Sequence, residues 1–141
     1  MNTDSYRALY MLNGFFWNGE LCDLVVEYSG KEISYRHPKT GSDQLARFIR
    51  PVQINVGRFS SYYDAVSEQL QEEVAPIGDC NAAHIDLLLT ETGRLVGFAD
   101  STLLRWGEES AKWRLSASSL LRGFEPAVIG QLKTPGVSPH Y

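Results

Sequence analysis

The chain has 141 residues, a length that fits one domain and buries roughly 68–70% of the surface of its unfolded state. Its hydrophobic fraction of 43% and charged fraction of 21% are ordinary for a globular protein. Thirteen Lys and Arg against seventeen Asp and Glu give a net charge of −4, which does not favour direct binding to nucleic acid. The composition predicts a folded domain whose partners are not DNA or RNA.

Cysteine content and hydropathy restrict the compartment. Cys22 and Cys80 are the only cysteines, too few for a disulfide framework. The N-terminus lacks a charged start followed by an apolar segment, and no apolar run approaches membrane-spanning length. We expect a cytoplasmic protein with no membrane partner.

The N-terminal half predicts two helices followed by strands. A first helix is expected over about Ser5–Asn13, capped by Thr3 or Asp4 and ended by Gly14. A second helix is indicated over residues 21–28, where apolar residues recur at helical spacing before Ser29-Gly30. Alternating patterns predict strands at 31–35 and 50–56, separated by a surface loop at 37–43.

The C-terminal half predicts a helix, several strands and a final helix. Ser61 and Asp64 have the spacing of a capping box, which places a helix over residues 61–73. Apolar runs at 74–106 predict strands, two of them joined by a Thr-Gly turn. A helix is expected over 108–122, because Glu108 and Glu109 suit its first turn and Gly123 suits its C-terminal end.

These elements predict an α+β fold, a mainly antiparallel twisted sheet with flanking helices. The strands cluster at 31–56 and 74–106 without regular β-α-β alternation, which disfavours a parallel sheet. We expect one domain over residues 1–126. Residues 127–141, rich in Pro and Gly, are interpreted as a C-terminal tail.

The sequence lacks recognisable reaction chemistry. It contains neither glycine-rich phosphate-binding pattern and no Gly-x-Ser-x-Gly elbow. Cys80 and His84 are four residues apart, and Cys22 or His37 could complete a metal site, but structural zinc normally requires paired ligands at short spacing. A Cys80 nucleophile partnered by His84 is the best enzymatic alternative, although no basic residue nearby would lower the thiol pKa. We predict no catalytic residue, no metal and no cofactor.

Acidic residues provide the main functional hypothesis. Glu68, Glu72 and Glu73 lie near the C-terminal end of the predicted 61–73 helix, and Asp79 follows. They form either a solvated face neutralised by an arginine elsewhere or an acidic patch that steers a cationic partner. Trp106, beside Gly107, is either a core residue or a partly exposed binding anchor. These five residues are the candidate partner-binding set.

Four short motifs, in this order along the chain, resemble the SUKH superfamily, specifically its third immunity-protein subfamily from bacterial polymorphic-toxin systems. Residues 24–30 are similar to the family's Glu-Tyr-Gly-Gly helix end, and 74–78 to its Tyr-Pro-x-Gly strand. Residues 90–95 are similar to its Asp-Glu-x-Gly-Arg-Val turn, and 116–123 to its closing Leu-Leu-x-Gly helix. Ser29, Ala75 and Thr90 depart from the family pattern. The resemblance covers about Glu20 to Gly123.

The resemblance implies a function that composition does not. Members of this family mostly bind and neutralise a cognate toxin, often a nuclease or nucleic-acid deaminase, by direct protein–protein contact. Other SUKH proteins act as non-catalytic regulatory adaptors unconnected to a toxin. We therefore expect a non-enzymatic immunity protein, with the adaptor as the alternative; the sequence names neither the toxin nor the oligomeric state.

Overall fold

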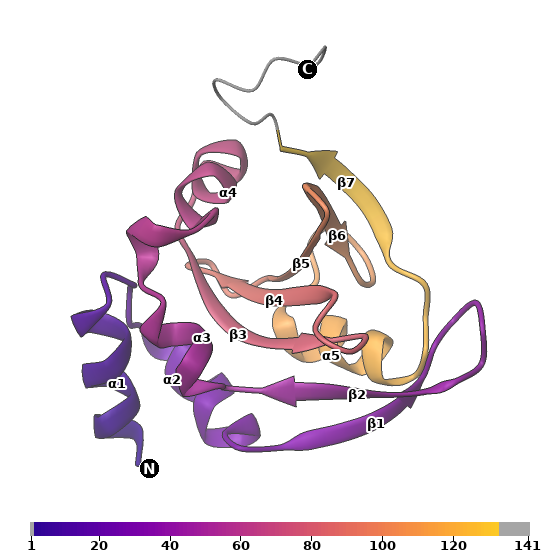
Figure 1. The fold of residues 1–141 in the computed structure, drawn as a ribbon, viewed down its shortest axis with the longest axis horizontal. Helices are drawn as coiled ribbons and strands as arrows, with labels where there is room; N and C mark the ends of the chain where they lie inside the picture. The colour runs from indigo at the N-terminus through magenta and orange to yellow at the C-terminus, as the bar shows by residue number, and fades with distance from the viewer. Residues whose placement is uncertain (1, 133–141) are drawn as a thin grey trace.

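The computed structural model describes residues 2–132, and these form a seven-stranded antiparallel sheet in which each strand pairs with the next along the chain (Figure 1). This meander confirms the predicted α+β class with its antiparallel sheet and flanking helices. The strands are β1 (Glu32–Arg36), β2 (Asp43–Phe48), β3 (Val74–Cys80), β4 (Ile85–Thr90), β5 (Leu95–Ala99), β6 (Thr102–Arg105) and β7 (Ala127–Gln131). The helices are α1 (Thr3–Leu12), α2 (Gly19–Tyr28), α3 (Pro51–Asn55), the 3-10 helix η1 (Arg58–Ser60), α4 (Tyr63–Leu70) and α5 (Trp113–Leu121).

The helices lie on both faces of the sheet. The ring of Phe98 stacks on Tyr62 at the start of α4, with ring centroids 4.0 Å apart. Its neighbour Gly97 faces Trp106 instead. Because successive residues of a strand point to opposite faces, α4 lies on the Phe98 face and Trp106 on the other.

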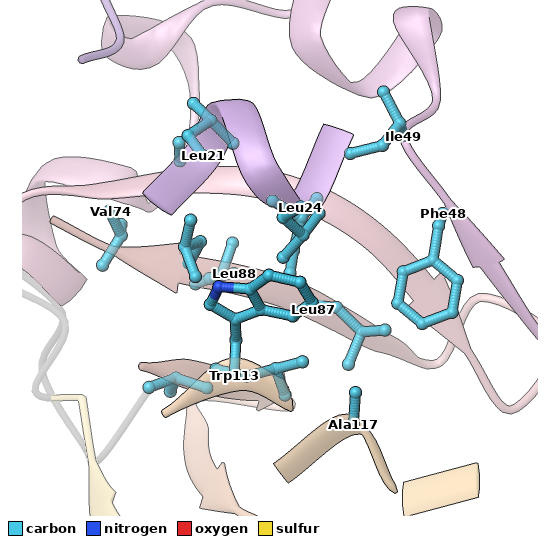
Figure 2. Packing of buried hydrophobic residues seen from close by; sticks show 14 of the residues in the cluster. Leu21, Leu24, Phe48, Ile49, Val74, Leu87, Leu88, Trp113 and Ala117 are labelled. Atoms are coloured by element: carbon cyan, nitrogen blue, oxygen red, sulfur yellow. The ribbon is translucent and has the colours of Figure 1, made fainter. Parts of the chain in front are cut away.

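The core centres on Trp113, which α5 inserts between α2 and the sheet. Figure 2 shows its indole ring beneath Leu21 and Leu24 of α2 and beside Leu87 of β4. Trp113 is 2% exposed and makes an edge contact with Tyr28, which in turn stacks on Phe48 of β2. This aromatic chain links two helices to one end of the sheet.

A buried tyrosine ties α1 to the sheet. Tyr10 is fully buried, and its hydroxyl donates a hydrogen bond of 2.5 Å to the carbonyl oxygen of Pro76 in β3. Burial raises the pKa of Tyr10 well above its usual range, so the hydroxyl stays protonated as a donor. The pairing of β3 with β4 is irregular between Pro76 and Gly78, so this bond also satisfies a carbonyl beside a bulge.

The strand predicted at 50–56 is wrong. These residues form α3, with Pro51 in the first helical turn, where its fixed φ and missing N–H are tolerated. Only Ile54 of the three alternating apolar residues is buried, while Val52 and Val56 are 71% and 52% exposed. The strand of this region is β2, just before it, partly in the segment assigned to a loop.

Two predicted helix starts are also wrong. The α4 helix begins at Tyr63 without a side-chain cap, and Asp64 bonds to Arg58 instead of closing a capping box with Ser61. The α5 helix begins at Trp113, which leaves Glu108 and Glu109 in the loop before it. Its predicted end is confirmed, since Gly123 has φ +78° just beyond the last turn.

The predicted tail begins too early. Residues 127–131 form β7 and pair with β6, which makes them an edge strand of the sheet. The remainder of the predicted tail, residues 133–141, lies outside the described residues. The sheet therefore includes a strand that the sequence analysis assigned to the tail.

The turn between β3 and β4 contains three consecutive left-handed residues. Asn81, Ala82 and Ala83 have φ of 54°, 54° and 66°. A left-handed conformation costs a residue with a Cβ roughly 1–2 kcal/mol, and only Asn of these three tolerates it well. The two alanines therefore store strain in the turn of the β3–β4 hairpin.

Replacing Ala83 with glycine should stabilise the protein by about 0.5–1 kcal/mol, because relief of the left-handed strain exceeds the added entropy of the unfolded chain. The matched control is Ala65→Gly in α4, which should lower stability by about 1 kcal/mol. Urea denaturation measures both changes. Two changes of the same sign would contradict the assigned backbone conformation.

Candidate functional site

Five carboxylates gather around a shallow hollow of about 530 Å³ on the α4 side of the molecule. We call this surface the acidic hollow. It is lined by Asp64, Glu68, Glu72, Glu73 and Glu91, together with Arg58, Phe59, Ser67 and Gln71. Three of the acids selected from the sequence thus meet here.

Glu68 is the acid most available to a partner. Its side chain is exposed at the C-terminal end of α4, where the helix dipole opposes negative charge. Glu73 and Asp64 instead share Arg58, whose Nε lies 2.8 Å from Asp64 Oδ1. These acids raise the already high pKa of Arg58, so the guanidinium stays charged. The hollow keeps a negative excess around this one cation.

Glu72 is held by hydrogen bonds in the wall of the hollow. Its carboxylate accepts bonds from the backbone N–H of Thr92 at 3.1 Å and the Thr92 hydroxyl at 2.7 Å, and Arg94 Nη2 donates from 2.5 Å. Burial raises the pKa of Glu72, but these hydrogen bonds more than offset that effect, and the net pKa lies below its usual value. Glu72, two residues beyond the end of α4, therefore connects the α4–β3 segment to the β4–β5 turn.

The structure separates Asp79 and Trp106 from this surface. Asp79 is 5% exposed, and its two oxygens accept bonds from Arg47 Nε at 3.0 Å and Arg50 Nη1 at 2.8 Å. Trp106 is 3% exposed, with its ring against Gly97. The hypothesis of Trp106 as an exposed anchor is wrong, and Asp79 is already paired within the fold.

An exposed apolar face adjoins the acidic hollow. Phe59 of η1 is 78% exposed and lines the hollow, with its ring packed over Gly14. Helices α1 and α3 contact each other, and the backbone N–H of Arg58 donates to the carbonyl oxygen of Asn13 at the end of α1. The apolar face comprises Met11, Leu12, Val52, Val56 and Phe59, each at least half exposed. Exposed apolar side chains on neighbouring elements beside charge are typical of a protein interface.

The sequence analysis did not select Phe59 or Glu91 as candidate binding residues, for a different reason in each case. Phe59 lies just before the predicted 61–73 helix, where an aromatic residue is expected to be buried, but α4 begins at Tyr63, four residues after it, and the ring is exposed. Glu91 is eighteen residues from Glu73, and only the fold places its carboxylate within 3.0 Å of the Glu73 backbone nitrogen. The spacing of Val52 and Val56 could have indicated an apolar surface, but only if residues 51–55 had been interpreted as a helix, where both side chains are exposed.

The best enzymatic pair from the sequence is not assembled for chemistry. Cys80 is buried in β3, whereas His84 is exposed at the end of the turn. Burial raises the pKa of the Cys80 thiol to about 12, which disfavours the nucleophilic thiolate. Among residues 2–132, no three His, Cys, Asp or Glu side chains are grouped to hold a metal ion.

Comparisons with protein-family models, with curated proteins and with solved structures return no match for this chain. Within the described part of the chain, no helix has both the length and the apolar character needed to cross a membrane. Functional inference therefore depends on the two adjoining surfaces themselves.

Replacing Glu72 with Gln should lower the free energy of unfolding by about 1–3 kcal/mol at pH 7, because three donors lose a charged acceptor. The folded-state pKa is lowered, so this stability is present above the unfolded pKa of about 4.3 and is lost as pH falls through the folded value. Urea titrations at pH 7 and pH 3 should show the difference shrinking at pH 3. The exposed control Glu68→Gln should stay within about 0.5 kcal/mol at both pH values.

The two cysteines should differ in reactivity. Cys22 is partly exposed and Cys80 is buried with a raised pKa, so iodoacetamide at pH 8 should alkylate Cys22 at least 100-fold faster. Mass spectrometry of timed digests measures both rates. Comparable rates in folded protein would contradict the burial of Cys80.

Proposed function

We propose that this protein is an immunity protein of the SUKH superfamily, which binds a cognate toxin domain directly and blocks it. The observation that carries the proposal is the acidic hollow joined to the apolar face through Phe59. Stable interfaces combine apolar anchors with a polar or charged rim, and the two surfaces together provide both.

Charge complementarity supports a toxin that acts on nucleic acid. Nucleases and nucleic-acid deaminases need cationic groups in the substrate cleft, because phosphate contacts dominate such binding. The acidic hollow has five carboxylates against one lining arginine, which suits the covering of such a cleft. Complementary charge of this kind raises the association rate and disfavours wrong partners.

Phe59 takes the role that the sequence assigned to Trp106. Its ring is exposed but oriented, since it packs over Gly14 and lies beneath the Arg58 guanidinium, 5.5 Å from the ring centroid. A partly immobilised aromatic ring loses little entropy on binding and can fill a pocket on the partner.

The experiment is co-purification of the protein with the toxin domain encoded immediately upstream, followed by rescue of growth when both are expressed. Stoichiometric binding and rescue are expected. No binding and no rescue would reject the immunity function. An isolated gene with no neighbouring toxin gene would favour the regulatory adaptor.

The surface is tested by the double variant Phe59→Ser with Glu68→Lys, which should weaken toxin binding at least tenfold and reduce protection. Both side chains are exposed, so stability should change little. The matched control is Leu115→Ser with Glu108→Lys, which makes the same kinds of change at exposed positions outside both surfaces. Equal binding by the variant and the control would reject this surface while leaving the immunity function standing.

A further inference from the structure

A second cavity, of about 240 Å³, lies away from the acidic hollow and shares no lining residue with it. It is bounded by the β1–β2 loop, the β3–β4 turn and the segment between α5 and β7. We call it the hairpin pocket. The lining residues relevant to ligand binding are Tyr35, His37, Lys39, Asn81, Trp106 and Phe124. Its lining includes Trp106 and Leu120 of α5.

The walls of the hairpin pocket are aromatic and apolar. Trp106 lines the pocket with the 3% of its surface that is exposed, and it is held in place by Gly97, where a Cβ would lie 2.7 Å from the indole ring. Phe124, which is 48% exposed, supplies most of the accessible aromatic surface, and Tyr35 is 7% exposed. Leu104, Leu120 and Val128 add apolar surface to the lining. Flat aromatic walls favour a flat aromatic ligand through offset or edge-to-face packing.

Two polar groups of the pocket have their acceptor atoms already occupied. His37 Nδ1 accepts the backbone N–H groups of Lys39 and Thr40 at 3.1 and 3.2 Å, so a neutral ring carries its proton on Nε2. Asn81 Oδ1 accepts the hydroxyl of Tyr35, so its Nδ2 remains as the donor. The groups left for a ligand are therefore N–H donors.

The charges at the rim do not oppose an anion. Lys39 Nζ lies 3.3 Å from Glu125 Oε1, and both side chains are mostly exposed. This pair balances the one carboxylate of the lining. Among the lining residues, donors and a balanced ion pair thus surround an aromatic cavity.

We infer that the hairpin pocket binds a small planar aromatic carboxylate, with its ring against Phe124 and the small exposed part of Trp106, and its carboxylate accepting from Asn81 Nδ2 and His37 Nε2. The cavity holds the volume of roughly eight water molecules, which suits a one- or two-ring ligand with a short acidic arm. The inference is independent of the proposed toxin binding, because the two sites share no residue.

The test is an NMR titration of the isotope-labelled protein with indole-3-acetate, compared with tryptamine, which carries the same ring with a cationic arm. Indole-3-acetate should shift the Trp106 indole N–H and the Asn81 backbone amide, with a dissociation constant of about 1 mM or tighter for a ligand of this size. It should bind at least threefold more tightly than tryptamine. No shift at the pocket, or equal binding of the two compounds, would overturn the inference.

The decisive variant is Asn81→Asp, which keeps the shape, the left-handed backbone and an acceptor for Tyr35 while replacing the donor with a negative charge. It should weaken indole-3-acetate at least tenfold and reverse the preference in favour of tryptamine. An unchanged preference, in a variant that retains the wild-type melting temperature, would overturn the inference.

His37→Asn provides a second test, because the asparagine side chain can still accept the loop N–H groups but lacks the Nε2 donor. It should weaken indole-3-acetate at least threefold. The matched control His84→Asn, at an exposed position outside the pocket, should bind like the wild type. Equal binding by both variants would remove His37 from the site and overturn the assigned donor pair.

Discussion

The fold depends on one junction at which three segments distant in sequence meet. The indole N–H of Trp113 donates to Glu20 Oε2 at 3.0 Å, and the Trp113 backbone N–H donates to the Gly93 carbonyl oxygen at 2.9 Å. Glu20 packs so closely on Gly93 that a Cβ there would lie 2.7 Å from its carboxyl carbon, and Gly93 has φ +92°. A meander needs helices to fill one face, and this junction aligns α2 and α5 against the same hairpin turn. The Thr-Gly turn singled out in the sequence is thus a docking point for two helices.

The long connections of the meander have different tasks. Most strands are joined by short turns, but residues 49–73 and 106–126 form two long connections that carry helices. The second provides α5 and so fills the core, as Figure 2 shows for Trp113 and Ala117. The first provides α3, η1 and α4, which hold most of the exposed apolar face and the acidic hollow. The proposed binding surface thus lies mostly on a connection, which the paired strands can position without depending on its exposed side chains.

The sequence predicts the α+β class, the helices around residues 3–28 and the strands between 74 and 106, because their periodicity matches their burial. It fails at 50–56, where Val52, Ile54 and Val56 alternate like a strand but Pro51 starts a short helix. It also fails at β7, a mostly exposed edge strand with little pattern to detect. For the candidate site, three of the four selected acids line one hollow. Asp79 does not, because it is paired with Arg47 and Arg50, which are 32 and 29 residues away from it in the sequence. No local pattern reveals such a partner.

Some acidic residues are paired with arginines and stabilise the fold, whereas others are exposed and can contact a partner. This difference determines which residues can be substituted without loss of stability. Asp79 and Glu72 accept hydrogen bonds from arginines, so removing either carboxylate leaves a cation without its partner. Glu68 and Phe59 are exposed, and changes to exposed side chains away from such networks usually cost within about 0.5 kcal/mol. The surface can therefore be altered to suit a different partner while the paired acids continue to hold α4 and β3 in place. A scaffold of this kind allows specificity to vary at nearly constant stability.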